Sequence, residues 1–202
     1  RIFSELIKIL DIDIIQKLKS DNRVLEIFCV LFPQLKYFDR IEKIKFLISK
    51  TNLKVDYCLT LAILLSDKPT NIEYWIYKHK IPNKIKNRLL NISKYIDLVK
   101  EKIFISEQSL KKIIYFTNNK EWTKDLLFFY YIFNSETDLQ DIKSALNFIN
   151  KTDIPKLPIS GETLIKYGFK KGEIIGQILK KIEQDWINNN FILEENFISK
   201  HS

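Results

Sequence analysis

The chain has 202 residues, of which 46% are hydrophobic and 29% charged, as is typical of a soluble globular protein. No apolar run approaches the roughly 18 residues that a bilayer-spanning helix needs, and acidic residues at Glu5, Asp11 and Asp13 interrupt any signal-like N-terminal pattern. These features exclude a membrane-spanning or secreted precursor, so we expect a cytoplasmic protein with no membrane partner.

The formal net charge of +8 comes almost entirely from one stretch of the chain. Residues 78–112 carry 10 basic and 3 acidic side chains, whereas residues 113–153 carry 4 basic and 6 acidic ones. Such a stretch is compatible with two interpretations, a solvated helix face in a Lys- and Ile-rich chain or a surface that binds phosphates. Both stay open at this point.

Hydrophobic residues recur with a helical period along almost the whole chain. The first segment shows the i, i+3, i+4, i+7 spacing at Phe3, Leu6, Ile7 and Leu10. Residues that favour helix starts or boundaries occur along the chain. We expect N-caps at Asp21, Asp39, Thr70, Ser106 and Asp138, and helix boundaries at Pro33, Pro69 and Pro82. Without a glycine before residue 161, tight β-hairpins are hard to build, so the predicted fold is all-α with about ten helices.

All four glycines lie between Gly161 and Gly176. Ser160 is expected to cap a short helix over 161–167, and Gly168 to end it in a left-handed conformation. A second helix is then expected from Gly172 to about Asn188, with Ile174, Ile178, Ile182 and Trp186 on one apolar stripe and Ile175 and Leu179 beside it. Gly172 and Gly176 are predicted to admit the close approach of another backbone.

Lysines surround this predicted helix-turn-helix. Lys166, Lys170 and Lys171 flank the turn, and the second helix begins with free backbone N–H groups, so a phosphate contact is one interpretation. A tight helix corner with surface lysines is the other.

The chain shows no catalytic or metal-binding constellation. Asp11 and Asp13 have the spacing of a divalent-metal pair, but they lack the usual preceding Gly-rich turn, and we expect Asp11 to cap a helix. Cys29 and Cys58 lie among apolar residues and are expected to be buried thiols, although two cysteines leave a disulfide possible. His79 and His201 belong to no metal-ligand cluster.

Aromatic residues are frequent and at helical spacing they are expected in the core. The alternative for Tyr77 and Tyr131 is a platform on which nucleic-acid bases stack.

Several segments carry a resemblance to one family. The segment Ile154–Trp186 contains an Ile-Pro, a Pro-Ile-Ser-Gly, a glycine ending a short helix, and a Gly-x-x-x-Gly followed by Leu and Trp. This pattern resembles the C-terminal signature of bacterial tRNA nucleotidyltransferases (CCA-adding enzymes) and their poly(A) polymerase relatives. Upstream, the family's Arg-x-x-x-Glu-Leu helix is similar to the segment from Arg1, its Ile-Phe-Pro to that ending at Pro33, and its Asn-Lys-x-Lys-x-Arg-Leu to residues 83–89.

The resemblance implies the neck, body and tail of such an enzyme, here residues 1–80, 81–153 and 154–202. The catalytic head, with its metal-binding carboxylates, Mg²⁺ and CTP or ATP, is expected upstream of Arg1, so this chain alone should have no catalytic residues and no cofactor. Arg1 and Glu5 match a neck pair that supports the nucleotide pocket. The expected partner is tRNA or tRNA-like RNA, gripped by its backbone. The candidate RNA-binding residues are Lys84, Lys86, Arg88, Lys166, Lys170 and Lys171.

Two other functions remain as alternatives. A freestanding helix-hairpin-helix module would bind the DNA backbone, although its glycines are usually two apart and Gly168 and Gly172 are four apart. A purely structural helical scaffold would bind neither nucleic acid. Whether the parent enzyme adds CCA or poly(A) depends on the head.

Overall fold

The computed structural model describes residues 2–65, 68–169 and 172–194, and these are helical or irregular, with no β-strand among them. They form twelve α-helices and two 3₁₀-helices, which confirms the all-α prediction. The first helices are α1 (Ile2–Ile9), α2 (Ile12–Ser20), α3 (Asn22–Leu31), α4 (Arg40–Lys50), α5 (Tyr57–Leu65), α6 (Pro69–His79) and α7 (Asn83–Tyr95). They are followed by η1 (Leu98–Lys100), η2 (Lys102–Ile105), α8 (Glu107–Thr117), α9 (Lys120–Phe133), α10 (Leu139–Lys151), α11 (Gly161–Lys166) and α12 (Glu173–Asn188).

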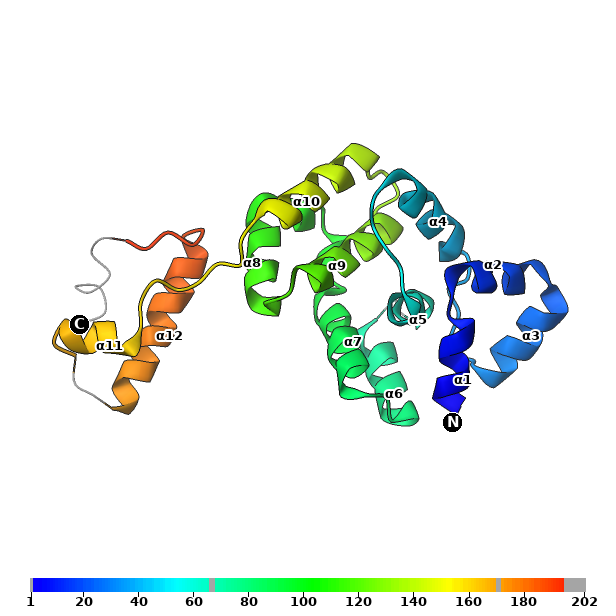
Figure 1. Cartoon of the computed structure of the whole chain (residues 1–202), viewed down its shortest axis with the longest axis horizontal. Coiled ribbons are helices and arrows are strands. Elements are labelled where there is room, and N and C mark those ends of the chain that lie inside the picture. Colours follow the sequence, from blue (N-terminus) through cyan, green and yellow to red (C-terminus); the bar gives the residue numbers. More distant parts are fainter. Residues whose placement is uncertain (1, 66–67, 170–171, 195–202) are drawn as a thin grey trace.

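Helices α1 to α10 form a body, and α11 and α12 form a tail that an extended segment separates from it (Figure 1). One hydrophobic core runs through the body from Leu6 to Ile149, without interruption at residue 80. A second, smaller core lies in the tail and is built around Leu164 and Ile182. The division of the body into a neck and a second region stays a prediction.

Helix α5 is the centre of the body. Its residues 58–65 are all buried, which explains why Tyr57 is followed by apolar residues, with Thr60 as the one polar exception, instead of an amphipathic pattern. Helix α9 is also deeply buried, with a continuous buried segment at 125–130. Because α9 contacts α4, α7, α8 and α10, it fixes the relative positions of the elements around it.

Most predicted helix starts are confirmed by hydrogen bonds. Side chains of Asp21, Ser106 and Asp138 accept backbone N–H groups from the first turns of α3, α8 and α10. Asp39 precedes α4 but makes no side-chain cap bond. The prediction for Thr70 is wrong, because α6 already begins at Pro69, whose ring pre-sets the dihedral angle of a first helical residue.

The glycines of the tail confirm one expectation and correct another. Gly168 has φ +94° and directly follows the last turn of α11, and Gly172 has φ +147° immediately before α12. However, a Cβ added at Gly172 or Gly176 would meet no described atom within 4 Å, so the predicted close backbone approach at these positions is wrong.

The reason lies in how α12 faces its neighbours. Ile174, on the predicted apolar stripe, is 63% exposed, whereas Ile175, predicted beside that stripe, is buried together with Ile182 and Trp186. This inner side of α12 is turned away from Gly176. The tight position is Gly161 instead, where an added Cβ would lie 3.3 Å from Ile175 Cγ2.

Candidate nucleic-acid interface

Helix α7 carries four of the ten basic residues of the 78–112 stretch. The extended backbone at Pro82 ends the turn after α6 and lets α7 start at Asn83. Lys84 and Arg88 are one turn apart and share a side of the helix, whereas Lys86 lies on a different side. Ile85 and Leu89 are buried between them and anchor the helix, so both lysine side chains are held at the surface.

Arg88 differs from the two lysines because its guanidinium is bound by carboxylates. Its Nε lies 2.6 Å from Asp125 Oδ2 and its Nη2 2.8 Å from Asp125 Oδ1, a bidentate pair between α7 and α9. Its Nη1 lies 2.5 Å from Asp56 Oδ2, just before α5. The RNA contact of Arg88 stays a prediction. In this geometry Arg88 links α7 to α9, through Asp125, and to the segment before α5, through Asp56.

The electrostatics of this cluster follow from its burial. Burial by itself lowers the pKa of Arg88, but hydrogen bonds and attraction from Asp125 and Asp56 outweigh it and hold that pKa above its ordinary value. Asp125 is only 6% exposed. Arg88 therefore stays charged at any pH at which the protein is folded, and it supplies the countercharge that Asp125 needs in this position.

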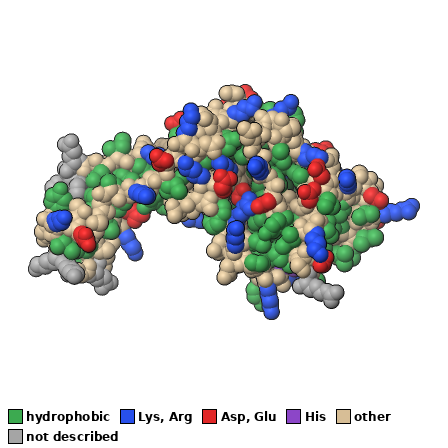
Figure 2. Space-filling view, in the orientation of Figure 1, with side chains coloured by type: hydrophobic (Ala, Val, Ile, Leu, Met, Phe, Trp, Pro, Cys, Tyr) green, Lys and Arg blue, Asp and Glu red, His purple; other side chains and the backbone are tan. Residues whose placement is uncertain are grey.

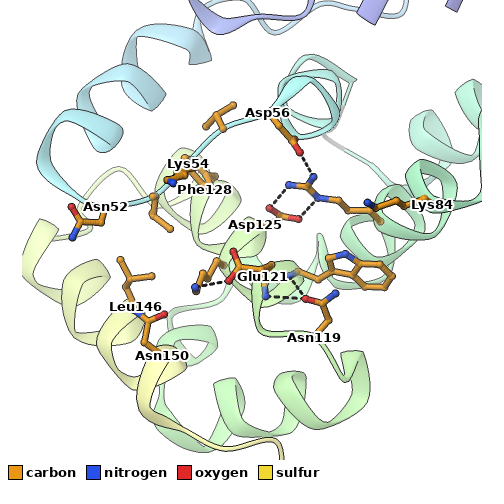
Figure 3. A pocket seen from close by; sticks show the side chains of 15 residues that line it. Asn52, Lys54, Asp56, Lys84, Asn119, Glu121, Asp125, Phe128, Leu146 and Asn150 are labelled. Atoms are coloured by element: carbon orange, nitrogen blue, oxygen red, sulfur yellow. Dashed lines mark hydrogen bonds and ion pairs between the residues drawn. The ribbon is translucent and has the colours of Figure 1, made fainter. Parts of the chain in front are cut away.

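A groove of about 860 Å³ opens beside this ion-pair cluster (Figure 3). It lies between the segment 52–56, α7, α9 and α10, and its wall combines amides with side chains of both charges. The polar lining residues are Asn52, Lys54, Asp56, Lys84, Arg88, Asn119, Glu121, Lys124, Asp125 and Asn150. Lys124 is neutralised by Glu121 at 2.6 Å, whereas Lys54 and Lys84 make no ion pair with any described residue.

Four exposed lysines near the α6–α7 turn likewise have no ion pair with a described carboxylate. They are Lys78, Lys80, Lys84 and Lys86. Elsewhere basic and acidic side chains alternate over the visible face of the body rather than forming one continuous basic patch (Figure 2). The lysines of this turn are therefore open to an external anion, as is the exposed Lys94 near the end of α7, which also has no ion pair with a described residue.

The remaining predicted RNA contacts lie in the tail. Lys166 is exposed in the last turn of α11. Lys170 and Lys171 lie outside the described residues. Helix α12 begins after Gly172, which has no side chain to cap it, and among the described residues no side-chain cap bond is made at this helix start.

The predicted neck pair is described only in part. Glu5 forms an ion pair with Lys8 at 2.9 Å on the surface of α1, and Arg1 lies outside the described residues. The role of these two residues in supporting a nucleotide pocket stays a prediction.

The Asp11–Asp13 pair has a structural use. Asp11 caps α2 by accepting from the backbone N–H groups of Asp13 and Ile14, as expected. Asp13 forms a 2.6 Å ion pair with Lys45 of α4, which lowers the pKa of its carboxyl. Across the described ranges, no three His, Cys, Asp or Glu side chains gather as metal ligands would.

Both cysteines are free thiols, which excludes a disulfide between them. Cys58 is buried as expected and Cys29 is half-buried. Burial raises the pKa of Cys58 to about 12, so its reactive thiolate form is suppressed at neutral pH. His201 lies outside the described residues.

The contact between body and tail was not foreseen from the sequence. Tyr115 of α8 donates a hydrogen bond to the carboxylate of Glu183 on α12. Its ring also meets Trp186 edge-on at a centroid distance of 5.4 Å and Phe191 at 5.5 Å. This aromatic cluster joins the tail to the body and sets the position of Lys166 relative to α7.

In a comparison with protein families, residues 54–201 match the family described as tRNA nucleotidyltransferase domain 2. The chain belongs to this family. The matched segment contains α5 to α12, and so includes most of the groove lining, the α6–α7 turn and the aromatic contact of this tRNA nucleotidyltransferase domain. A comparison with curated proteins gave no match. In the described part of the domain, every helix is too short or too polar to cross a bilayer.

Proposed function

We propose that this tRNA nucleotidyltransferase domain grips tRNA or tRNA-like RNA by its phosphate backbone while a catalytic head domain upstream of Arg1 adds nucleotides to the 3′ end. The observation that carries the proposal is the set of exposed lysines around the α6–α7 turn without a carboxylate partner among the described residues. An exposed lysine without an internal partner is free to neutralise a phosphate and release its counterions.

The tail supplies a second contact in this proposal. Lys166 and the uncapped start of α12 lie close together in sequence, and both favour an anion. The Tyr115–Glu183 bond holds this corner at a defined distance from α7. Two separated basic points on a rigid frame suit the backbone of a folded RNA, whose bases are inaccessible within its deep major groove.

CCA addition to tRNA is the reaction we propose for the whole enzyme, with Mg²⁺, CTP and ATP bound by the head. Asp11 and Asp13 already serve a helix cap and an ion pair, which supports placing the metal chemistry outside these two residues. The test is to incubate the chain with tRNA lacking its 3′ end, CTP, ATP and Mg²⁺, beside an active CCA-adding enzyme. We expect no incorporation by the chain, and measurable incorporation would overturn this division of labour.

A competition experiment tests the RNA preference. Labelled tRNA bound to the chain is challenged with unlabelled tRNA or with duplex DNA of equal phosphate concentration. We expect tRNA to displace the label at lower concentration. A preference for duplex DNA would instead support a helix-hairpin-helix module, and failure to bind either would support a scaffold.

A further inference from the structure

Two tyrosine rings stand exposed on the outer face of α6. Tyr77 is 86% exposed and Tyr74 is 52% exposed, and their spacing of three residues puts them one turn apart on the same face. The opposite face carries the buried Ile72 and Trp75, which attach the helix to the body. Because the two tyrosines contribute little to the core, packing does not account for them.

The same corner of the molecule is strongly basic. Lys78 Nζ lies 5.9 Å from the centroid of the Tyr74 ring, and Lys80 follows at the end of the helix with φ +46°. A left-handed conformation is uncommon for a residue other than glycine or asparagine. Glu73 is the one acidic residue between positions 69 and 84. Exposed aromatic rings therefore lie among positive charges that no described carboxylate pairs with.

We propose that the α6–α7 corner, formed by Tyr74, Tyr77, Lys78, Lys80 and Lys84, binds an unpaired stretch of RNA. In this inference, which rests on the proposed function, a base stacks on the Tyr77 ring and the lysines hold the flanking phosphates. Lysines alone would suit the backbone of a duplex. The exposed rings add a requirement for a free base face, which only an unpaired nucleotide offers.

The α6–α7 corner lies where an RNA could extend an unpaired segment beyond the paired region that the lysines are proposed to hold. In Figure 1 the α6–α7 turn lies at the lower edge of the body, whereas the tail lies at the far left. Lys84 belongs both to this corner and to the wall of the groove beside Arg88. An RNA held along α7 can therefore reach the tyrosines where its paired region ends.

Binding of two RNA hairpins tests the inference, one blunt and one with a short unpaired 3′ extension. We expect the chain to bind the extended hairpin about tenfold more tightly, the size of one base–aromatic stack. Tyr77→Ala should remove most of this preference, and Tyr77→Phe should keep it. The matched control is Phe46→Ala, because Phe46 is a 48% exposed ring with Lys50 Nζ 5.8 Å from its centroid, outside the corner.

The outcomes separate the two proposals. Equal affinity of the unmodified chain for the two hairpins, or a preference retained by Tyr77→Ala, would overturn the inference while leaving the backbone grip intact. The same results would be expected if the tyrosines served a protein partner. Failure of the unmodified chain to bind either hairpin would overturn the proposed function itself. Circular dichroism of each variant verifies that the helices are retained.

Photo-crosslinking provides a second, independent measurement. With 4-thiouridine in the unpaired extension, we expect a crosslink to the peptide that contains Tyr74 and Tyr77. Crosslinks found only outside residues 69–84 would contradict the placement of the unpaired nucleotides at this corner.

Discussion

Arg88 and Asp125 form a bidentate ion pair between α7 and α9, with N–O distances of 2.6 and 2.8 Å. Asp56 accepts a third hydrogen bond from the same guanidinium. The charge of Arg88 is therefore balanced by carboxylates of the domain itself. The neighbouring lysines in the sequence have no carboxylate partner among the described residues. This contrast separates a residue that joins elements of the body from lysines that are available to an external anion.

Arg88→Ala should therefore act mainly on stability. Removing the guanidinium leaves Asp125 buried without its countercharge, and breaking a buried pair in this way costs about 3 kcal/mol. Urea unfolding measures the change. Lys84→Ala is the control, because an exposed residue without a partner should shift the free energy of unfolding by less than about 0.5 kcal/mol. Weaker RNA binding by Arg88→Ala with unchanged stability would instead assign Arg88 a direct contact.

Tyr115→Phe should loosen the tail without unfolding the body. The change removes the hydrogen bond to Glu183 but keeps the ring contacts with Trp186 and Phe191. A hydrogen bond to a charged group contributes about 1.5–3 kcal/mol. Amide hydrogen exchange should quicken in α11 and α12 and stay unchanged in α9. Tyr57→Phe, at a ring 36% exposed on α5, is the control, and equal protection of the tail in both variants would contradict this role.

High pH should weaken the same hydrogen bond between Tyr115 and Glu183. Burial and then Glu183 raise the pKa of Tyr115 to about 12, above its ordinary value of 10. Because the folded-state pKa is raised, the contribution of neutral Tyr115 is complete below pH 10 and is lost as the pH rises toward 12. Tail protection should fall over this range in the unmodified chain and much less in Tyr115→Phe.

The environment of His79 should make the free energy of unfolding depend on pH below neutrality. Burial, and then the charge of Lys78, lower the pKa of His79 below 6.5, and its Nε2 is buried without a hydrogen-bond partner. The unfolded state therefore takes up a proton more readily, so the free energy of unfolding should be greatest above pH 6.5 and fall as the pH decreases below it.

His79→Phe isolates this effect. Phenylalanine keeps a ring beside Trp75, whose centroid lies 3.9 Å from that of His79, but it does not titrate. His201 is present in both proteins, so the difference between their unfolding curves at several pH values reports on His79. Identical pH dependence in the two proteins would contradict the assignment.

Substitution of two tail glycines by alanine should change the free energy of unfolding in opposite directions. Gly176 lies inside α12 with open space around it, so Gly176→Ala should stabilise the domain by about 0.5–1 kcal/mol through helix propensity. Gly168→Ala should destabilise it by about 1 kcal/mol, because φ +94° is unfavourable for a residue with a side chain. Urea unfolding of both variants tests this, and a shared sign would show that the glycines act in another way.

The sequence predicts features of this fold that depend on local interactions. Asp21, Ser106 and Asp138 cap helices through bonds that span only a few residues, and Gly168 ends a helix by its own dihedral angle. Their neighbours in the sequence therefore suffice to identify them. Thr70 was misplaced because Pro69, one residue earlier, is a stronger helix start.

Features that depend on distant partners could not be predicted in the same way. Arg88 and Asp125 are 37 residues apart, and Tyr115 and Glu183 are 68 apart. The buried side of α12 was misassigned at Ile174 because both edges of an apolar stripe look alike until the neighbouring helix is known. The basic stretch itself could be read from the sequence, but the division between its paired arginine and the lysines without a described carboxylate partner required the structure.

The salt dependence of tRNA binding tests most directly whether the lysines of α7 neutralise RNA phosphates. The logarithm of the binding constant should fall linearly with the logarithm of salt concentration, by about 0.7–0.9 for each phosphate neutralised. Lys84→Ala/Lys86→Ala should reduce this slope by about 1.5. Lys143→Ala/Lys151→Ala, which removes two exposed lysines of α10 outside the basic stretch, should leave it unchanged. A flat salt response, or equal slopes for the two double variants, would contradict the proposed grip.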